Sequence, residues 1–307
     1  QDPVLATSQL RHFVISRKTN VIYELDGCAS PTKQYSALTV DEVSALADAD
    51  PQDVAVDSNG ALWIARFDLP SILITSPLQT IDLSAFDADG RPDMSSVKII
   101  GHHAFVALER LTVVGQNFVS QQPSQVAVLD TDTKELVKTI TLVGRNPFGQ
   151  MVVSPETGPT KIWLAEPGNF SDAGETAAGI ETIDPLTFAS TLVVSETALG
   201  ASAVEVAANA SCAAAIVADA TTENATSLVS FSLDGTNLSK PVLSTPNFSL
   251  RGLLWTNETP ARLLVGDATN SGGNFFVHVF SADPQTCALT KVADWAMPNM
   301  PALAFAD

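Results

Sequence analysis

Six charged residues occupy equivalent positions in a repeating pattern, because each directly follows a short apolar run. In chain order they are Arg17, Arg66, Glu109, Glu166, Asp219 and Asp267. Four converging carboxylates would supply the oxygen ligands that a hard cation such as Ca²⁺ requires. We therefore predict a metal site at Glu109, Glu166, Asp219 and Asp267, with Ca²⁺ as its ion. The alternative is a solvated rim without metal, in which the two arginines offset the acids and mutual repulsion raises some carboxyl pKa values.

A second set of polar residues is expected at the same end of the repeats, where the chain enters each innermost strand. These residues are Asp53, Asp93, Asn146, Gln150 and Asn299. Together with Arg17 and Arg66 they form the predicted ligand- or partner-binding set. Asn117 and Phe118 join this set because they lie in the connection 110–123, and long connections in compact domains often carry function.

The composition excludes several partners and reactions. The 307 residues include 34 acidic and 16 basic side chains, for a formal net charge of −18. A nucleic-acid or anionic-membrane partner is excluded, because neutralising phosphates requires clustered Lys and Arg. No apolar run reaches the roughly 18 residues of a transmembrane span. The sequence lacks the Gly-x-Ser-x-Gly elbow of serine hydrolases, and its four histidines lack the spacing of zinc ligands.

The elements that position these side chains are expected to be strands. Short runs rich in Val, Ile, Leu and Thr end in Asp at about 50-residue intervals, the length of one four-stranded propeller blade. They end at Asp26, Asp130, Asp184, Asp234 and Asp283, and a degenerate copy occupies 71–75. An apolar run precedes each of them, and Gly, Pro, Asn and Asp bound the runs, as is typical of strands. The predicted fold is all-β, a single β-propeller domain over residues 1–307 with six four-stranded blades.

The two ends of the chain are predicted to share one blade. The C-terminal segment 301–307 matches the innermost strand expected at 51–57, and the N-terminal segment is expected to begin with a second strand. The last blade would then take its innermost strand from the C-terminus and the others from the N-terminus. Such closure removes exposed sheet edges. A short helical turn is expected within 39–46.

The cysteines and the composition bear on the compartment. Cys28 and Cys287 each follow an Asp-ended strand, so we predict a disulfide between them, with Cys212 as a buried small side chain. Sparse Lys, abundant Ser, Thr and Ala, and strong acidity favour a secreted, periplasmic or cell-surface protein whose signal peptide has been removed.

One repeat unit carries a resemblance to a known family. The pattern is an apolar strand, a loop, a strand ending in Asp, and then a turn and a Val- and Thr-rich strand, and its best copy is at 130–140. In this pattern the chain resembles the YncE-like, or YVTN-repeat, β-propellers of bacterial surfaces along essentially its whole length. It contains no Tyr-Val-Thr-Asn, and we count six units where that family usually has seven. The resemblance implies scaffolding and binding roles and supplies no catalytic residues.

Three functions are therefore considered. The first is a non-catalytic secreted or cell-surface propeller that binds a protein or a small-molecule ligand on the face that carries these loops, around the expected central channel. The second is a Ca²⁺-dependent lactonase or related hydrolase of the six-bladed type, in which the four acids hold the ion. The third is a glycan-binding propeller, which would need an aromatic side chain at equal positions in successive loops.

Overall fold

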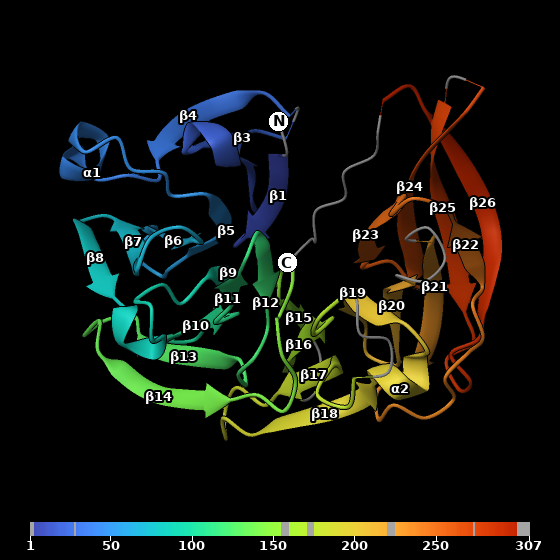
Figure 1. Cartoon of the computed structure of the whole chain (residues 1–307). Helices are drawn as coiled ribbons and strands as arrows, with labels where there is room; N and C mark the ends of the chain where they lie inside the picture. Colours follow the sequence, from blue (N-terminus) through green and yellow to red (C-terminus); the bar gives the residue numbers. More distant parts are fainter. Residues whose placement is uncertain are drawn as a thin grey trace. The chain divides into compact units, whose positions relative to one another are not determined.

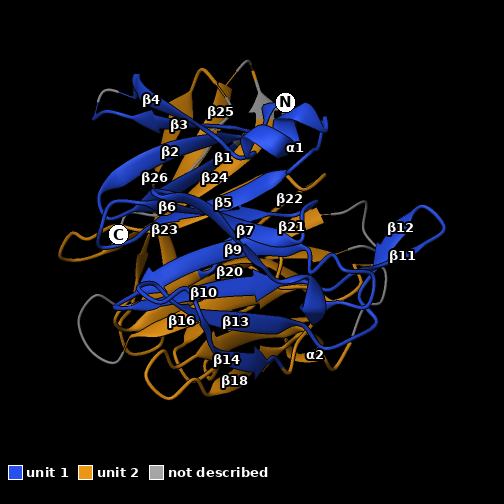
Figure 2. Cartoon of the chain, turned by 90° about the vertical axis from the view of Figure 1, so that its left-hand side faces the viewer, with its two compact units in different colours: residues 1–142, 149–151, 307 blue, residues 143–148, 152–306 orange. Residues whose placement is uncertain are grey.

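The computed structural model describes residues 3–27, 29–154, 160–170, 175–219, 225–272 and 274–299. They form six four-stranded antiparallel sheets and one two-stranded hairpin (Figure 1). The contacts divide the chain into two compact units, each with three of the four-stranded sheets (Figure 2). Unit 1 contains 1–142, 149–151 and 307, and unit 2 contains 143–148 and 152–306.

The strands of unit 1 form the sheets β1-β2-β3-β4, β5-β6-β7-β8 and β9-β10-β13-β14, with the hairpin β11-β12 inserted between β10 and β13. Their bounds are β1 (Pro3–Ser8), β2 (Arg11–Ser16), β3 (Val21–Leu25), β4 (Pro31–Ser36), β5 (Pro51–Val56), β6 (Leu62–Arg66), β7 (Ser71–Thr75), β8 (Leu78–Asp82), β9 (Met94–Ile100), β10 (His103–Leu108), β11 (Thr112–Val114), β12 (Asn117–Val119), β13 (Gln125–Asp130) and β14 (Leu136–Thr141). The short helices are η1 (Arg17–Thr19), α1 (Val40–Ser44) and η2 (Ser84–Phe86).

Unit 2 forms the sheets β15-β16-β17-β18, β19-β20-β21-β22 and β23-β24-β25-β26. Their bounds are β15 (Val152–Ser154), β16 (Lys161–Glu166), β17 (Gly179–Ile183), β18 (Ser190–Ser195), β19 (Ser202–Ala208), β20 (Cys212–Asp219), β21 (Ala225–Ser232), β22 (Leu243–Thr245), β23 (Leu250–Trp255), β24 (Arg262–Ser271), β25 (Asn274–Ala282) and β26 (Leu289–Met297), with the short helix α2 (Glu196–Leu199) after β18. No helix among the described residues is long and apolar enough to cross a membrane.

The Asp-ended runs are the third strands of their sheets, as predicted, and the aspartate has a local role. Asp130 Oδ1 accepts the backbone N–H groups of Asp132 (2.9 Å) and Thr133 (2.7 Å). Asp184 and Asp283 accept the corresponding two groups in their own turns. An Asp side chain that holds the next two or three N–H groups stabilises the turn into the outer strand. The aspartate recurs in the sequence because each of these turns needs it to bind its backbone N–H groups.

The predicted entry of the N-terminus into the fold is wrong. The first sheet already has its innermost strand in β1, which pairs with β2 from Pro3–Ser16 to Ser8–Arg11. Gln9 (φ 49°) and Leu10 (φ 61°) form the two-residue turn between them. Such turns usually contain Asn or Gly because both residues need positive φ, so nothing in this sequence marks the turn. The proposed closing strand 301–307 lies outside the described residues.

The predicted helical turn within 39–46 is confirmed as α1. Thr39 Oγ1 accepts the N–H of Glu42 (3.3 Å), and the Glu42 carboxylate accepts the N–H of Thr39 (2.7 Å). This reciprocal capping box satisfies two backbone donors at the start of the helix.

Carboxylates join the innermost strands of neighbouring sheets at or beside β-bulges. The strands β5, β9, β19 and β23 each carry a bulge. In unit 1, Asp53 of β5 accepts the N–H of Val97 in β9 (3.1 Å). In unit 2, Glu205 of β19 accepts the N–H groups of Gly252 and Leu253 in β23. A bulge interrupts the ladder and leaves a backbone group unpaired, so the neighbouring sheet's acid provides its partner.

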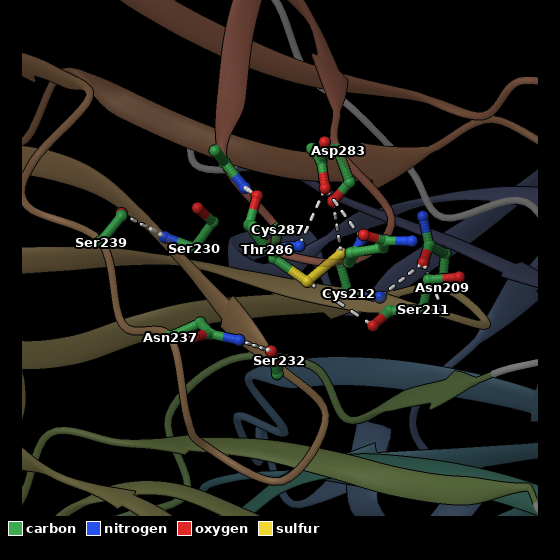
Figure 3. Close-up of a disulfide and its surroundings, with 12 residues drawn as sticks. Asn209, Ser211, Cys212, Ser230, Ser232, Asn237, Ser239, Asp283, Thr286 and Cys287 are labelled. Atoms are coloured by element: carbon green, nitrogen blue, oxygen red, sulfur yellow. Dashed lines mark hydrogen bonds between the residues drawn. A yellow bond between two sulfur atoms is a disulfide. The ribbon is translucent and has the colours of Figure 1, made fainter.

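The predicted Cys28–Cys287 disulfide is wrong, because Cys287 is bonded to Cys212 (Figure 3). Cys212 begins β20, and Cys287 lies in the turn between β25 and β26, so the bond joins two sheets of unit 2. The Cα atoms are 5.5 Å apart, within the usual range for a disulfide. Cys212 N–H donates to Asn209 Oδ1 (2.8 Å) and Cys287 N–H to the carbonyl of Asp283 (2.8 Å). Cys28 lies outside the described residues.

Candidate functional site

Most of the predicted residues lie at one edge of their sheets, where the second strand ends and the innermost strand begins. In an antiparallel sheet these two points are adjacent. Unit 1 holds Arg17, Asp53, Arg66, Asp93, Glu109, Asn117, Phe118 and Gln150, and unit 2 holds Asn146, Glu166, Asp219, Asp267 and Asn299.

Arg66, one of the predicted binding residues, lies in the interior of unit 1. It is 0% exposed and its guanidinium donates to Glu42 Oε2 (2.7 Å), to the carbonyl of Ala37 (3.2 Å), and to the carbonyl and hydroxyl of Ser71. Burial lowers the pKa of Arg66 against the opposing effect of Glu42. The contacts with Ala37 and Glu42 tie the end of β6 to the segment around α1, and those with Ser71 tie it to the start of β7.

Arg17 binds a side chain in the segment that precedes β5. Its guanidinium makes a two-pronged ion pair with Asp50, with both N–O distances at 2.7 Å. Such fork-like pairs are geometrically specific. The pair connects the end of β2 to the residue just before β5.

Asp53 is enclosed by donors and serves as an anchor. It is 0% exposed and accepts from Ser96 Oγ (2.6 Å) and Gln150 Nε2 (3.1 Å), with Lys98 Nζ at 3.4 Å. Gln150 also donates to the carbonyl of Leu5 (2.8 Å). The structure thus brings two predicted residues, Asp53 and Gln150, together in a saturated network that joins innermost strands within unit 1.

Asp93 and Glu109 form a pair of buried acids at the edge of one sheet of unit 1. The N–H of Glu109 donates to the Asp93 carbonyl (3.0 Å), and the Asp93 carboxylate accepts the N–H of Leu111 (2.7 Å). Burial raises the pKa of Asp93 to about 7. Burial, followed by the charge of Asp93, raises the pKa of Glu109 well above its ordinary value. Burial therefore favours the protonated form of both acids.

Glu166 and Glu181 form a second buried pair, in unit 2. Both are 0% exposed. They lie diagonally on adjacent strands, since Leu164 pairs with Glu181 and Glu166 with Gly179. Neither oxygen of Glu166 meets a hydrogen-bond donor among the described residues. Burial, and then the neighbouring Glu181 carboxylate, raises the pKa of Glu166 well above its ordinary value.

Backbone donors hold the other member of this pair. Glu181 Oε2 accepts the N–H groups of Val143 and Gly144, both at 2.9 Å. Burial and the neighbouring carboxylate therefore favour the protonated form of Glu166. Sequence reasoning missed Glu181 because it occupies the third strand and not a strand end.

Substitution of Gly144 is expected to disturb this pair. A Cβ atom at Gly144 would stand 1.8 Å from Glu166 Oε2, so Gly144→Ala should lower the free energy of unfolding by about 1–3 kcal/mol through overpacking. Urea denaturation measures the loss. In the Glu166→Ala background the same substitution should cost much less, because the clashing carboxyl is gone. Equal costs in the two backgrounds would contradict the contact.

Asp267 belongs to a charge row across the last sheet. His278 is 6% exposed, and its Nε2 lies 3.2 Å from Asp267 Oδ2 while its Nδ1 lies 2.5 Å from Asp294 Oδ1. Lys291 Nζ lies 2.7 Å from the same Asp294 oxygen. His278 and Asp294 are cross-strand partners in β25 and β26. Sequence reasoning missed the contact because it depends on the register between these two strands.

The remaining predicted residues of unit 2 do not form a common site. Asn146 is buried and donates to the carbonyl of Gly168 (2.9 Å). Asp219 is half-buried at the end of β20, and Asn299 is exposed beyond β26. Over the described part of the chain, no group of three or more His, Cys, Asp or Glu side chains is arranged to hold a metal ion.

Exposed aromatic side chains occupy the same loop edges. In unit 1, Phe118 of the β11-β12 hairpin is 60% exposed and packs edge-to-face on Phe67, with ring centroids 5.7 Å apart. In unit 2, Phe170 meets both Phe148 (5.4 Å) and Phe248 (6.3 Å) in edge-to-face contacts. Sequence reasoning found Phe118 and missed the unit 2 cluster, whose members come from three separate connections.

Comparison with known proteins shows the fold. No protein-family model and no curated protein sequence matches the chain. A streptogramin B lyase structure is similar with a TM-score of 0.63 and 14% identity, over 99% of this chain and 86% of that one. Kuenenia stuttgartiensis hydrazine synthase has a TM-score of 0.59 and 13% identity, over 91% and 75%. The dihydro-heme d1 dehydrogenase NirN has a TM-score of 0.58 and 11% identity, over 95% of this chain and 57% of that one. Such likenesses show fold alone, and the fold of this chain is an all-β six-bladed propeller of four-stranded antiparallel sheets.

Proposed function

We propose that this chain is a non-catalytic binding module of an oxidising compartment that takes a protein partner on the loops following its second strands. One observation carries the proposal: these loops expose apolar side chains while the acids and arginines beside them are buried or committed to internal contacts. On the β11-β12 hairpin, Val113 and Phe118 are each 60% exposed. Exposed apolar groups gathered in this way are typical of interaction sites.

The disulfide supports the choice of compartment. Structural disulfides persist in secreted and extracytoplasmic proteins and are rare in the reducing cytosol. Cys212 and Cys287 are each 1% exposed, so their bond is shielded from exchange with other thiols.

Site-specific photo-crosslinking tests the proposal. A photo-reactive phenylalanine analogue at position 118 is expected to give a discrete adduct with a protein from the producing organism's extracytoplasmic fraction, and excess unlabelled protein should suppress it. The matched control is the same analogue at Leu136, which is 50% exposed on β14. Adducts of equal yield at both positions, or none at 118, would contradict the proposal. Steady turnover of lactone substrates that rises with added Ca²⁺ would favour the hydrolase alternative.

A further inference from the structure

The β11-β12 hairpin is a two-stranded sheet with open edges. Its strands pair with each other, from Thr112–Val119 to Val114–Asn117, and with no other strand of the described chain. Figure 2 shows the hairpin extending away from the four-stranded sheets of unit 1. An open strand edge presents backbone N–H and C=O groups on which another chain can pair.

The register of the hairpin directs one residue of each strand towards an open edge. The turn at Gly115–Gln116 closes the pair Val114–Asn117, and successive pairs of an antiparallel ladder alternate between hydrogen-bonded and non-bonded. Val113 and Phe118 therefore form a non-bonded pair, whose N–H and C=O groups point away from the partner strand. Each of them is 60% exposed, so an apolar side chain accompanies the outward backbone groups.

The hairpin lacks the residues that usually protect an open edge. Natural edge strands carry charged side chains, above all Lys, or Pro, which oppose pairing with another chain. The outer strands β14 and β26 contain Lys138 and Lys291. Residues 111–122 contain neither a charged side chain nor a proline. The sequence of the hairpin therefore favours the addition of a strand.

The base of β11 is attached to an acidic connection. The N–H of Leu111 donates to the Asp93 carboxylate (2.7 Å), and Arg110 Nε donates to the carbonyl of Phe86 (2.8 Å). The other two Arg110 nitrogens donate to Gln122 and to a backbone carbonyl, so this guanidinium is engaged within unit 1. The connection 83–93 also carries Asp87 and Asp89, with Arg91 as its one base.

This charge selects among the possible occupants of the edge. Acids beside an interface favour a partner that carries Lys or Arg. Phe118 also packs on Phe67, whose neighbour Asp68 adds a further acid. A second copy of the chain would bring the same acids to the contact and has a formal net charge of −18, so repulsion opposes self-pairing.

We infer that the open edge of β11 binds an extended, basic segment of a protein partner as an added strand. The inference rests on the proposed function, since it names the binding mode and the partner chemistry at the unit 1 part of that surface. The N–H and C=O groups of Val113 supply main-chain hydrogen bonds, as in other cases of strand addition. Alternate apolar side chains of the partner contact the exposed faces of the hairpin.

Fluorescence anisotropy with the whole chain tests the inference with two labelled peptides. The basic probe is Lys-Val-Thr-Val-Lys-Val-Lys, and the acidic probe has Glu in place of each Lys. We expect the basic probe to bind at least about tenfold more tightly, because like charges oppose the acidic probe. Added NaCl should weaken its binding. Asp89→Asn should weaken it too, whereas Glu135→Gln, at an exposed acid in unit 1, should leave it unchanged.

A proline substitution tests the backbone contact. Val113→Pro removes the outward N–H, and proline is tolerated at an edge position whose N–H faces solvent, so the pairing with β12 should persist. The variant should bind the basic probe about fivefold more weakly through the lost hydrogen bond. Val113→Thr keeps the N–H and the branched side chain and should retain the affinity. In wild type, the probe should slow hydrogen exchange of the amides in 111–120, which needs no variant.

The possible outcomes separate this inference from the proposed function. Equal affinity for the two probes, no binding of the basic probe, or exchange protection confined to other segments overturns it. Unchanged affinity in Val113→Pro also overturns it. Dimers of the chain alone that Val113→Pro dissociates overturn it in favour of a second copy. The Phe118 crosslink is read independently, so an adduct without peptide binding removes strand addition and leaves the proposed function in place.

Discussion

The protein is expected to be most stable near pH 4.5 and to lose stability steadily as the pH rises to 8. Five carboxyl groups cause the loss, since burial raises their pKa values: those of Asp93 and Glu205 to about 7, those of Glu109 and Glu166 well above the ordinary value, and that of Asp68 above it. Each holds its proton in the folded chain and loses it on unfolding. The free energy of unfolding therefore falls by about 1.4 kcal/mol per pH unit for each group, between its unfolded and folded pKa values.

At low pH the free energy of unfolding is expected to change in the opposite direction, because the pKa of another carboxyl group is lowered in the folded protein. Hydrogen bonds from Arg11 lower the pKa of Glu24 to about 2. A lowered pKa contributes stability that is present above the unfolded value and is lost as the pH falls towards 2. Urea denaturation between pH 3 and 8 should therefore give a curve with its maximum on the acid side of neutrality.

Glu166→Gln isolates the contribution of one of these groups. A neutral amide of the same shape binds no proton, so the variant should unfold with a pH slope smaller by about 1.4 kcal/mol per unit between pH 5 and 7. It should be more stable than wild type at pH 7.5 and close to it at pH 4.5. Glu135→Gln is the matched control and should leave the slope unchanged. Parallel curves for wild type and Glu166→Gln would show that Glu166 is ionised in the folded protein.

Loss of the disulfide is the second large effect expected. The bond closes a loop with a sequence separation of 75, and loop-closure entropy for that length corresponds to about 4 kcal/mol. Cys212→Ala, Cys287→Ala and the double variant should lose similar amounts of unfolding free energy in urea, because each removes the same bond. Many domains are stable by only about 5–15 kcal/mol, so a loss of this size should be plain.

Peptide mapping provides the control. Digestion without reductant should give one linked peptide pair that contains Cys212 and Cys287. Cys28→Ala should change neither this pair nor the unfolding midpoint. Recovery of a Cys28–Cys287 peptide would refute the pairing and restore the one expected from repeat position alone.

The parts of the fold that follow from local chemistry were predictable from the sequence. Asp130, Asp184 and Asp283 each close a turn with backbone groups only two and three residues away, so they recur wherever a third strand ends. The capped helix at Thr39 is equally local. The places of Glu109, Glu166 and Asp219 at the ends of second strands were likewise found, because alternation and turn signals locate a strand's end, whereas Asp267 lies inside β24, which continues to Ser271.

The partners of those acids were not predictable, because they depend on register and on contacts between sheets. Glu166 meets Glu181 diagonally across a strand pair, and Asp267 meets His278 in the same way. The turn at Gln9 and Leu10 lacks the residues that mark positive φ, so β1 was missed. The disulfide joins two sheets at elements that occupy different places in the repeat, so repeat position alone suggested the wrong partner.

The carboxylate bridges between innermost strands have a consequence for how such a chain can change by duplication. Asp53 and Glu205 each accept backbone groups of the following sheet. Copying, deleting or exchanging a single blade would therefore separate an acid from the bulge that it serves. The segment that must be kept together therefore extends from the innermost strand of one sheet to the bulged innermost strand of the next, and it crosses the boundary between blades. Chimaeric chains joined at those boundaries should fold less well than chains joined one strand further on.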